Sequence, residues 1–130
     1  MKKILIVDDE EKIARIYKSL LADEGYEVFE ANDSHSATHL LVAQKDIDLI
    51  LLDIRMPSVN GVMLCEIARE YNPEIKVIVT SACPLEDQKR LIIKADDYYE
   101  KSQGLEMLLS KIKTVLEGEG KETTNLMGVS

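Results

Sequence analysis

Five short apolar segments alternate with stretches of helical periodicity along this chain, and this alternation limits the fold more than any other feature. The segments cover residues 3–7, 26–31, 49–53, 76–80 and 96–101. Between them, apolar residues recur at intervals of three and four, as on one face of a helix. Strands that alternate with helices pair in parallel through right-handed crossovers. The pattern therefore predicts a single α/β domain, with a doubly wound five-stranded parallel sheet and helices on both faces.

Capping residues support several of the predicted helix boundaries. Asp33 or Ser34 precedes the second helix, Asn60 precedes the third, and Pro84 lies where the first turn of the fourth is expected. The fourth helix, from Leu85 to Ile93, has the weakest apolar pattern. Local signals thus mark the starts of the second, third and fourth helices.

Length and charge exclude several classes of protein. The 130 residues fit one domain, and the net charge of −8 argues against direct nucleic-acid binding, which needs a basic face. No segment approaches the roughly 20 apolar residues that span a membrane. Two cysteines are too few for a disulfide framework, so we expect a cytoplasmic protein. We expect a folded domain over residues 1–117 and a flexible tail or linker start over residues 118–130, which lack periodicity.

Polar side chains collect at the carboxyl ends of the predicted strands, where open parallel sheets bind their ligands. The first strand ends in Asp8 and Asp9, the third in Asp53, the fourth in Thr80 and the fifth in Lys101. If the first and third strands are neighbours, three carboxylates converge. Two such charges about 4 Å apart repel by about 4 kcal/mol at an effective dielectric constant near 20. The cluster therefore calls for a cation or for protonation.

The available ligands are all oxygens, which favours Mg²⁺ first and Mn²⁺ next. Because Mg²⁺ commonly binds carboxylates together with phosphate oxygens, the site suits a phosphoryl group. Asp53 stands alone at a central strand end and is the best candidate for a nucleophile that becomes an aspartyl phosphate. Thr80 and Lys101 would then meet the charge of the transferred group. Acids that follow strands can also be simple helix caps, but capping explains neither Thr80 nor Lys101.

Four motifs in this order resemble the receiver domain of two-component response regulators, over residues 3–116. They read "ILIVDDE", "LILLDIRMPSVNG", "VIVTSA" and "ADDYYEKS". The resemblance implies the flavodoxin-like strand order 2-1-3-4-5. It also implies a signalling phosphoacceptor in a phosphorelay rather than a conventional enzyme.

The resemblance further implies a role for each residue of the site. Asp53 would accept phosphate from a phosphohistidine of a sensor histidine kinase or of a histidine phosphotransfer protein. Mg²⁺ would be held by Asp8, Asp9 and Asp53, and by the backbone carbonyl of Arg55.

Activation is implied to involve a second group of residues. Thr80 and Lys101 would bind the phosphoryl oxygens, and Tyr98 matches the aromatic switch position of the family. Tyr99, its neighbour, should point to the other face of the strand. The changed surface would be helix four, strand five and helix five, which a downstream target, a fused output domain or a second copy in a homodimer could recognise.

One departure from the family pattern concerns the loop after Lys101. Ser102 stands where the family usually has proline, often after a cis peptide bond, and this bond in our chain is either trans with a shifted loop or cis under strain. The departure keeps open an alternative function, a degenerate pseudo-receiver that binds partners without phosphorylation.

Three other readings are weaker. A phosphohydrolase of the haloacid dehalogenase type would need a second Asp where Arg55 stands. A flavin- or nucleotide-binding module would need a phosphate-binding loop in place of the acidic "DDEEK". His35 and His39 have the spacing of a helical metal pair but read as solvated surface histidines.

Overall fold

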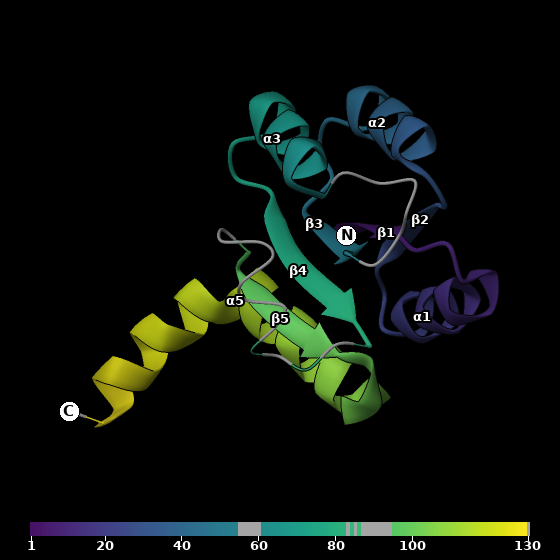
Figure 1. The fold of residues 1–130 in the computed structure, drawn as a ribbon. Helices are drawn as coiled ribbons and strands as arrows, with labels where there is room; N and C mark the ends of the chain where they lie inside the picture. The colour runs from purple at the N-terminus through teal and green to yellow at the C-terminus, as the bar shows by residue number, and fades with distance from the viewer. Residues whose placement is uncertain (55–60, 83, 85, 87–94, 130) are drawn as a thin grey trace.

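The fold is a single parallel sheet between two layers of helices (Figure 1). The computed structural model describes residues 1–54, 61–82, 84, 86 and 95–129, with side chains up to residue 117. The sheet has the order β2-β1-β3-β4-β5, and all neighbouring strands pair in parallel. This confirms the predicted flavodoxin-like order. The strands are β1 (Lys3–Val7), β2 (Glu27–Ala31), β3 (Leu49–Asp53), β4 (Lys76–Ser81) and β5 (Asp97–Glu100).

The helices divide between the two faces of the sheet (Figure 1). On one face lie α1 (Glu11–Asp23) and α5 (Leu105–Val129), and on the other lie α2 (Ser34–Ala43) and α3 (Gly61–Tyr71). The predicted fourth helix, Leu85 to Ile93, falls largely outside the described residues. The four described helices agree with the doubly wound architecture that the alternating pattern predicts.

The side-chain period of two in a strand divides the core into two halves. All five residues of β3 are buried. Ile50 and Leu52 pack with side chains of α2 and α3, whereas Leu49 and Leu51 pack with those of α1 and α5. This explains why β3 is apolar up to Asp53 and not alternating, since both of its faces are covered.

One of the predicted helix caps can be checked directly. The Asp33 carboxylate accepts a hydrogen bond of 2.7 Å from the backbone N–H of Ser36, at the start of α2. This bond holds the pKa of Asp33 below its ordinary value. Asn60, the predicted cap of α3, lies outside the described residues.

The C-terminal helix is longer than the sequence pattern indicates. Residues 118–130 show no apolar periodicity in the sequence, but the backbone of α5 continues as a helix to Val129 and runs past the edge of the sheet (Figure 1). The division into a folded domain over residues 1–117 and a flexible tail or linker start over residues 118–130 stays a prediction. None of the helices in the described part of the chain combines the length and the apolar composition needed to cross a membrane.

Because β3 lies in the middle of the sheet and is buried, shortening one of its side chains should lower the stability of the fold strongly. Ile50 is fully buried, so Ile50→Ala is expected to lower the free energy of unfolding by roughly 3 kcal/mol through lost burial and a residual cavity. Val62→Ala removes two methyl groups from a side chain that is 51% exposed, and should cost less than about 0.5 kcal/mol. Urea unfolding followed by circular dichroism compares the two, and equal losses would contradict this description of the core.

Candidate functional site

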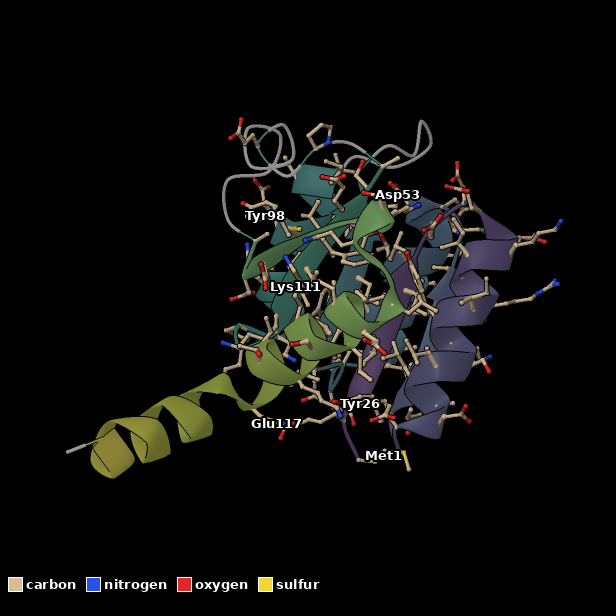
Figure 2. All side chains as sticks on the ribbon, turned by 90° about the horizontal axis from the view of Figure 1, so that it is seen from below. Met1, Tyr26, Asp53, Tyr98, Lys111 and Glu117 are labelled. Atoms are coloured by element: carbon tan, nitrogen blue, oxygen red, sulfur yellow. The ribbon has the colours of Figure 1, made fainter. Side chains whose placement is uncertain are left out.

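Three of the polar residues predicted at the strand ends, Asp8, Asp53 and Lys101, lie together at one edge of the sheet. Asp53 is the last residue of β3, and Asp8 follows β1 directly. Both are almost fully buried, with exposures of 3% and 2%. Figure 2 shows Asp53 at one end of the molecule and Met1, Tyr26 and Glu117 near the opposite end. The parallel pairing of β1 with β3 therefore places two carboxylates side by side at a single edge.

Lys101 connects these strand ends. It follows β5, and its side chain is only 12% exposed. Its Nζ atom lies 3.0 Å from Oδ2 of Asp8 and 3.1 Å from Oδ2 of Asp53. A third carboxylate, that of Glu10, accepts a hydrogen bond from the same Nζ atom at 3.1 Å. One ammonium group thus bonds three carboxylates, which uses each of its three N–H donors.

Burial and charge oppose each other in this cluster. Burial by itself lowers the pKa of Lys101, but the negative charges of Asp53 and Asp8 outweigh it and hold that pKa above its ordinary value. Burial also raises the pKa of Asp8, despite the N–H of Glu10 and the ammonium of Lys101 that favour its charged form. The side chain of Lys101 is therefore positively charged at neutral pH. Its single charge does not fully offset the cost of burying the Asp8 carboxylate.

The donor set fits a divalent cation. Oxygen atoms of Asp8, Glu10 and Asp53 all lie within 4.8 Å of one another. Three carboxylates and one ammonium leave two negative charges, which a divalent ion would balance. Because each of these donors is a carboxylate oxygen, the set favours Mg²⁺ or Mn²⁺ over softer metals.

Glu10 is the member of this cluster that the sequence did not reveal. We expected Asp9 beside Asp8, yet Asp9 is exposed and lies outside the group of three. The Oδ1 atom of Asp8 accepts a hydrogen bond of 2.9 Å from the N–H of Glu10, which forms a turn of the Asx type. This turn explains how Glu10 comes to lie near Asp8. The sequence signal that could have indicated it is the spacing: Asp8 follows a strand, and Glu10 comes two residues later. A metal-binding role for Asp9 remains a prediction.

Thr80 and the two tyrosines of β5 lie where the strand pattern predicts. Thr80 is buried and pairs in register with Asp53 on one side and Tyr99 on the other. Tyr98 packs against the core on the α2–α3 face, and Tyr99 is buried in the core on the α1–α5 face. The expected alternation of the two tyrosines is thus confirmed. The backbone carbonyl of Tyr98 also accepts a hydrogen bond from the Lys111 side chain (Figure 2).

The loop after Lys101 has a defined conformation without proline. The described residues contain no cis peptide bond, so the bond between Lys101 and Ser102 is trans. Residues Lys101–Gln103 form a 3₁₀ turn in which Glu100 and Gln103 cap one another reciprocally. The Tyr99 hydroxyl donates a 2.8 Å hydrogen bond to the carbonyl of Gly104, whose φ of 92° suits glycine. Side-chain hydrogen bonds therefore hold the turn that presents Lys101 to the acids.

Arg55, whose backbone carbonyl is a predicted metal ligand, lies outside the described residues, and so does Cys83. The two histidines considered as a metal pair, His35 and His39, are both exposed on α2. They lie on a different element from the acids, so they take no part in the cluster around Lys101.

From the contacts of Lys101 with the carboxylates we predict that this lysine stabilises the fold when no metal is present. Lys101→Ala leaves two buried carboxylates without their cation and is expected to lower the free energy of unfolding by roughly 3 kcal/mol in buffer with a chelator. Added Mg²⁺ should restore part of this loss. Urea unfolding at neutral pH, with and without Mg²⁺, measures both effects.

Lys18→Ala provides a matched control. Lys18 is half-exposed and forms a long ion pair of 3.7 Å with Glu30, so its loss should cost about 0.5 kcal/mol or less and should not respond to Mg²⁺. The description of the site would be wrong if the two variants lost the same stability.

Comparison with known proteins agrees with this geometry. A family model described as the response regulator receiver domain matches residues 4–113. The crystal structure of TrrA from Thermotoga maritima in complex with Mg²⁺-BeF is 33% identical in sequence, with a TM-score of 0.78, and the match covers 89% of this chain and 100% of that one.

Two further structures show the same relationship. A CheY-like response regulator receiver domain protein from Methanospirillum hungatei is 32% identical, with a TM-score of 0.80 and coverage of 94% of this chain and 98% of that one. A receiver domain from Francisella is 28% identical, with a TM-score of 0.77 and coverage of 92% and 99%. The chain therefore belongs to the receiver domains of response regulators, which are phosphoacceptor modules of two-component signalling rather than conventional enzymes.

Proposed function

We propose that the chain is a phosphorylation-activated switch in a phosphorelay, with Asp53 as the phosphoacceptor. The observation that carries the proposal is the position of Asp53 at the carboxyl end of the central strand β3. There its carboxylate accepts a hydrogen bond from Lys101 and lies near the carboxylate oxygens of Asp8 and Glu10. Receiver domains typically act with sensor kinases, so the donor is a phosphohistidine of such a kinase or of a phosphotransfer protein.

In the proposed step, an oxygen of Asp53 attacks phosphorus while the bond between phosphorus and the imidazole nitrogen of the donor breaks. The electron pair of that bond goes to the imidazole, and an acyl phosphate forms on Asp53. Lys101 stabilises the charge on the phosphoryl oxygens as a hydrogen-bond donor, and the Thr80 hydroxyl, which is in register with Asp53, provides a second donor.

Asp8 and Asp53 are buried carboxylates that could hold a divalent ion, and Asp9 and the Arg55 carbonyl are further proposed ligands. Bound Mg²⁺ would offset the negative charge of the acids and of the incoming phosphoryl group. TrrA was crystallised with Mg²⁺-BeF, which supports a metal of this kind here. Mn²⁺ has similar ligand preferences and is the second choice.

The response to phosphorylation is proposed to pass through β4 and β5. New bonds from Thr80 and Lys101 to the phosphoryl oxygens would pull the loop after β4 inward, and Tyr98, three residues before Lys101, would turn into the space that this loop vacates. The surface formed by the fourth helix, β5 and α5 is then the region that a downstream protein, a fused output domain or a second copy recognises.

The alternative function is a pseudo-receiver that binds partners without phosphorylation. Ser102 in place of proline was the main reason to consider it. The trans bond at Ser102 and the contact of Lys101 with Asp53 weigh against it, because the loop delivers the lysine without proline.

Intact mass spectrometry tests the acceptor. After incubation with Mg²⁺ and a small acyl phosphate, the wild type should gain the mass of one phosphoryl group, and Asp53→Asn should gain none because an amide is a poor nucleophile. Chelating the metal should prevent the gain.

Asp48→Asn is the matched control, since Asp48 lies just before β3, at the end of the strand away from the site, and accepts a bond from the N–H of Lys3. It should be phosphorylated as the wild type is. A wild type that binds Mg²⁺ but gains no mass would reject the proposal and favour the pseudo-receiver.

A further inference from the structure

Glu10 shares Lys101 with the two buried aspartates but differs from them in its surroundings. The side chains of Asp8 and Asp53 are 1% and 4% exposed, whereas that of Glu10 is 57% exposed. All three accept a hydrogen bond from the same ammonium at 3.0–3.1 Å. Glu10 is therefore the partner that water can replace most easily when Lys101 changes its bonds.

The number of donors on Lys101 creates a competition. An ammonium group has three N–H donors, and in this chain three carboxylates occupy them. A phosphoryl group on Asp53 brings further acceptor oxygens to the same ammonium. Because Asp53 loses its negative charge when it is phosphorylated, the donor that Lys101 gives to Asp53 can pass to a phosphoryl oxygen. Any further bond from Lys101 to the phosphoryl group requires the release of Asp8 or Glu10, and exposed Glu10 is the less costly of the two to lose.

We propose that Glu10 is a positioning residue that competes with the phosphoryl group for Lys101. In the unmodified chain Glu10 holds the lysine at the rim of the site, and phosphorylation of Asp53 displaces Glu10 into solvent. The contact therefore stabilises the unmodified state and lowers the affinity of the site for a phosphoryl group. This inference rests on the proposed function of Asp53 and adds a residue that sets how strongly the phosphorylated state is favoured.

Beryllofluoride, a mimic of the phosphoryl group, measures this effect without covalent chemistry. At saturating Mg²⁺, Glu10→Gln is expected to bind beryllofluoride about two- to fivefold more tightly than the wild type, the range expected for an exposed charged pair. Fluorine NMR gives the affinity. The Mg²⁺ concentration for half-maximal binding is measured in the same series, since it responds if Glu10 acts mainly as a metal ligand.

Glu11→Gln is the matched control. It removes the same charge one residue along the chain, and Glu11 contacts Arg15 on the exposed side of α1, where its side chain is 68% exposed. Its affinity for beryllofluoride should stay at the wild-type value. An equal gain in both variants would attribute the effect to general charge repulsion and overturn the role of the Lys101 contact.

A double-mutant cycle tests whether the contact exists in the unmodified chain. Glu10→Gln and Lys101→Ala, alone and together, are compared by urea unfolding in a chelator. The coupling should change the unfolding equilibrium constant by about two- to fivefold. No coupling would overturn the inference.

The outcomes separate the inference from the proposed function. If the wild type binds beryllofluoride as tightly as Glu10→Gln or more tightly, Asp53 stays the proposed acceptor, but competition by Glu10 is rejected. Weaker binding by Glu10→Gln, together with a higher Mg²⁺ requirement, would make Glu10 a metal ligand and also reject the competition. A wild type that binds Mg²⁺ but no beryllofluoride would reject the proposed function and the inference together.

Discussion

The bonds from one lysine ammonium to three carboxylates connect parts of the chain that are far apart in sequence. Lys101 follows the edge strand β5, Asp8 follows β1, and Asp53 ends the central strand β3. Because Asp8 and Asp53 are buried and their charges repel, they can lie together only if a cation lies between them or one of them is protonated. The position of the turn after β5 and the charge state of the site therefore depend on the same few contacts.

The sequence predicts most of this arrangement because parallel strands have a simple geometry. Once β1, β3, β4 and β5 pair in parallel, the residues at their carboxyl ends must share one edge. Asp8, Asp53 and Thr80 are recognisable since each is a polar residue at the end of a buried apolar run. Tyr98 and Tyr99 follow from the alternation of side chains along a strand.

Two of the features that the sequence did not predict depend on local turns. Glu10, not Asp9, joins the acids because the Asp8 side chain accepts a bond from the Glu10 N–H, a contact that residue types alone do not determine. The turn at Ser102 depends on the reciprocal hydrogen bonds of Glu100 and Gln103, which replace the conformational restriction of a proline. The continuation of α5 past residue 117 was missed because its sequence has glycines and no apolar period.

The separation between Met1 and the acidic edge, the end of the sheet that carries Asp8, Glu10 and Asp53, has a practical consequence (Figure 2). Met1 and Glu117 lie near the end of the sheet opposite Asp53, and a five-residue strand such as β3 is about 17 Å long. A fluorophore or surface linker attached at Met1 would leave the acidic edge open to a large donor protein. It would also report on the site only through rearrangement of the strands and helices between them, not by direct contact.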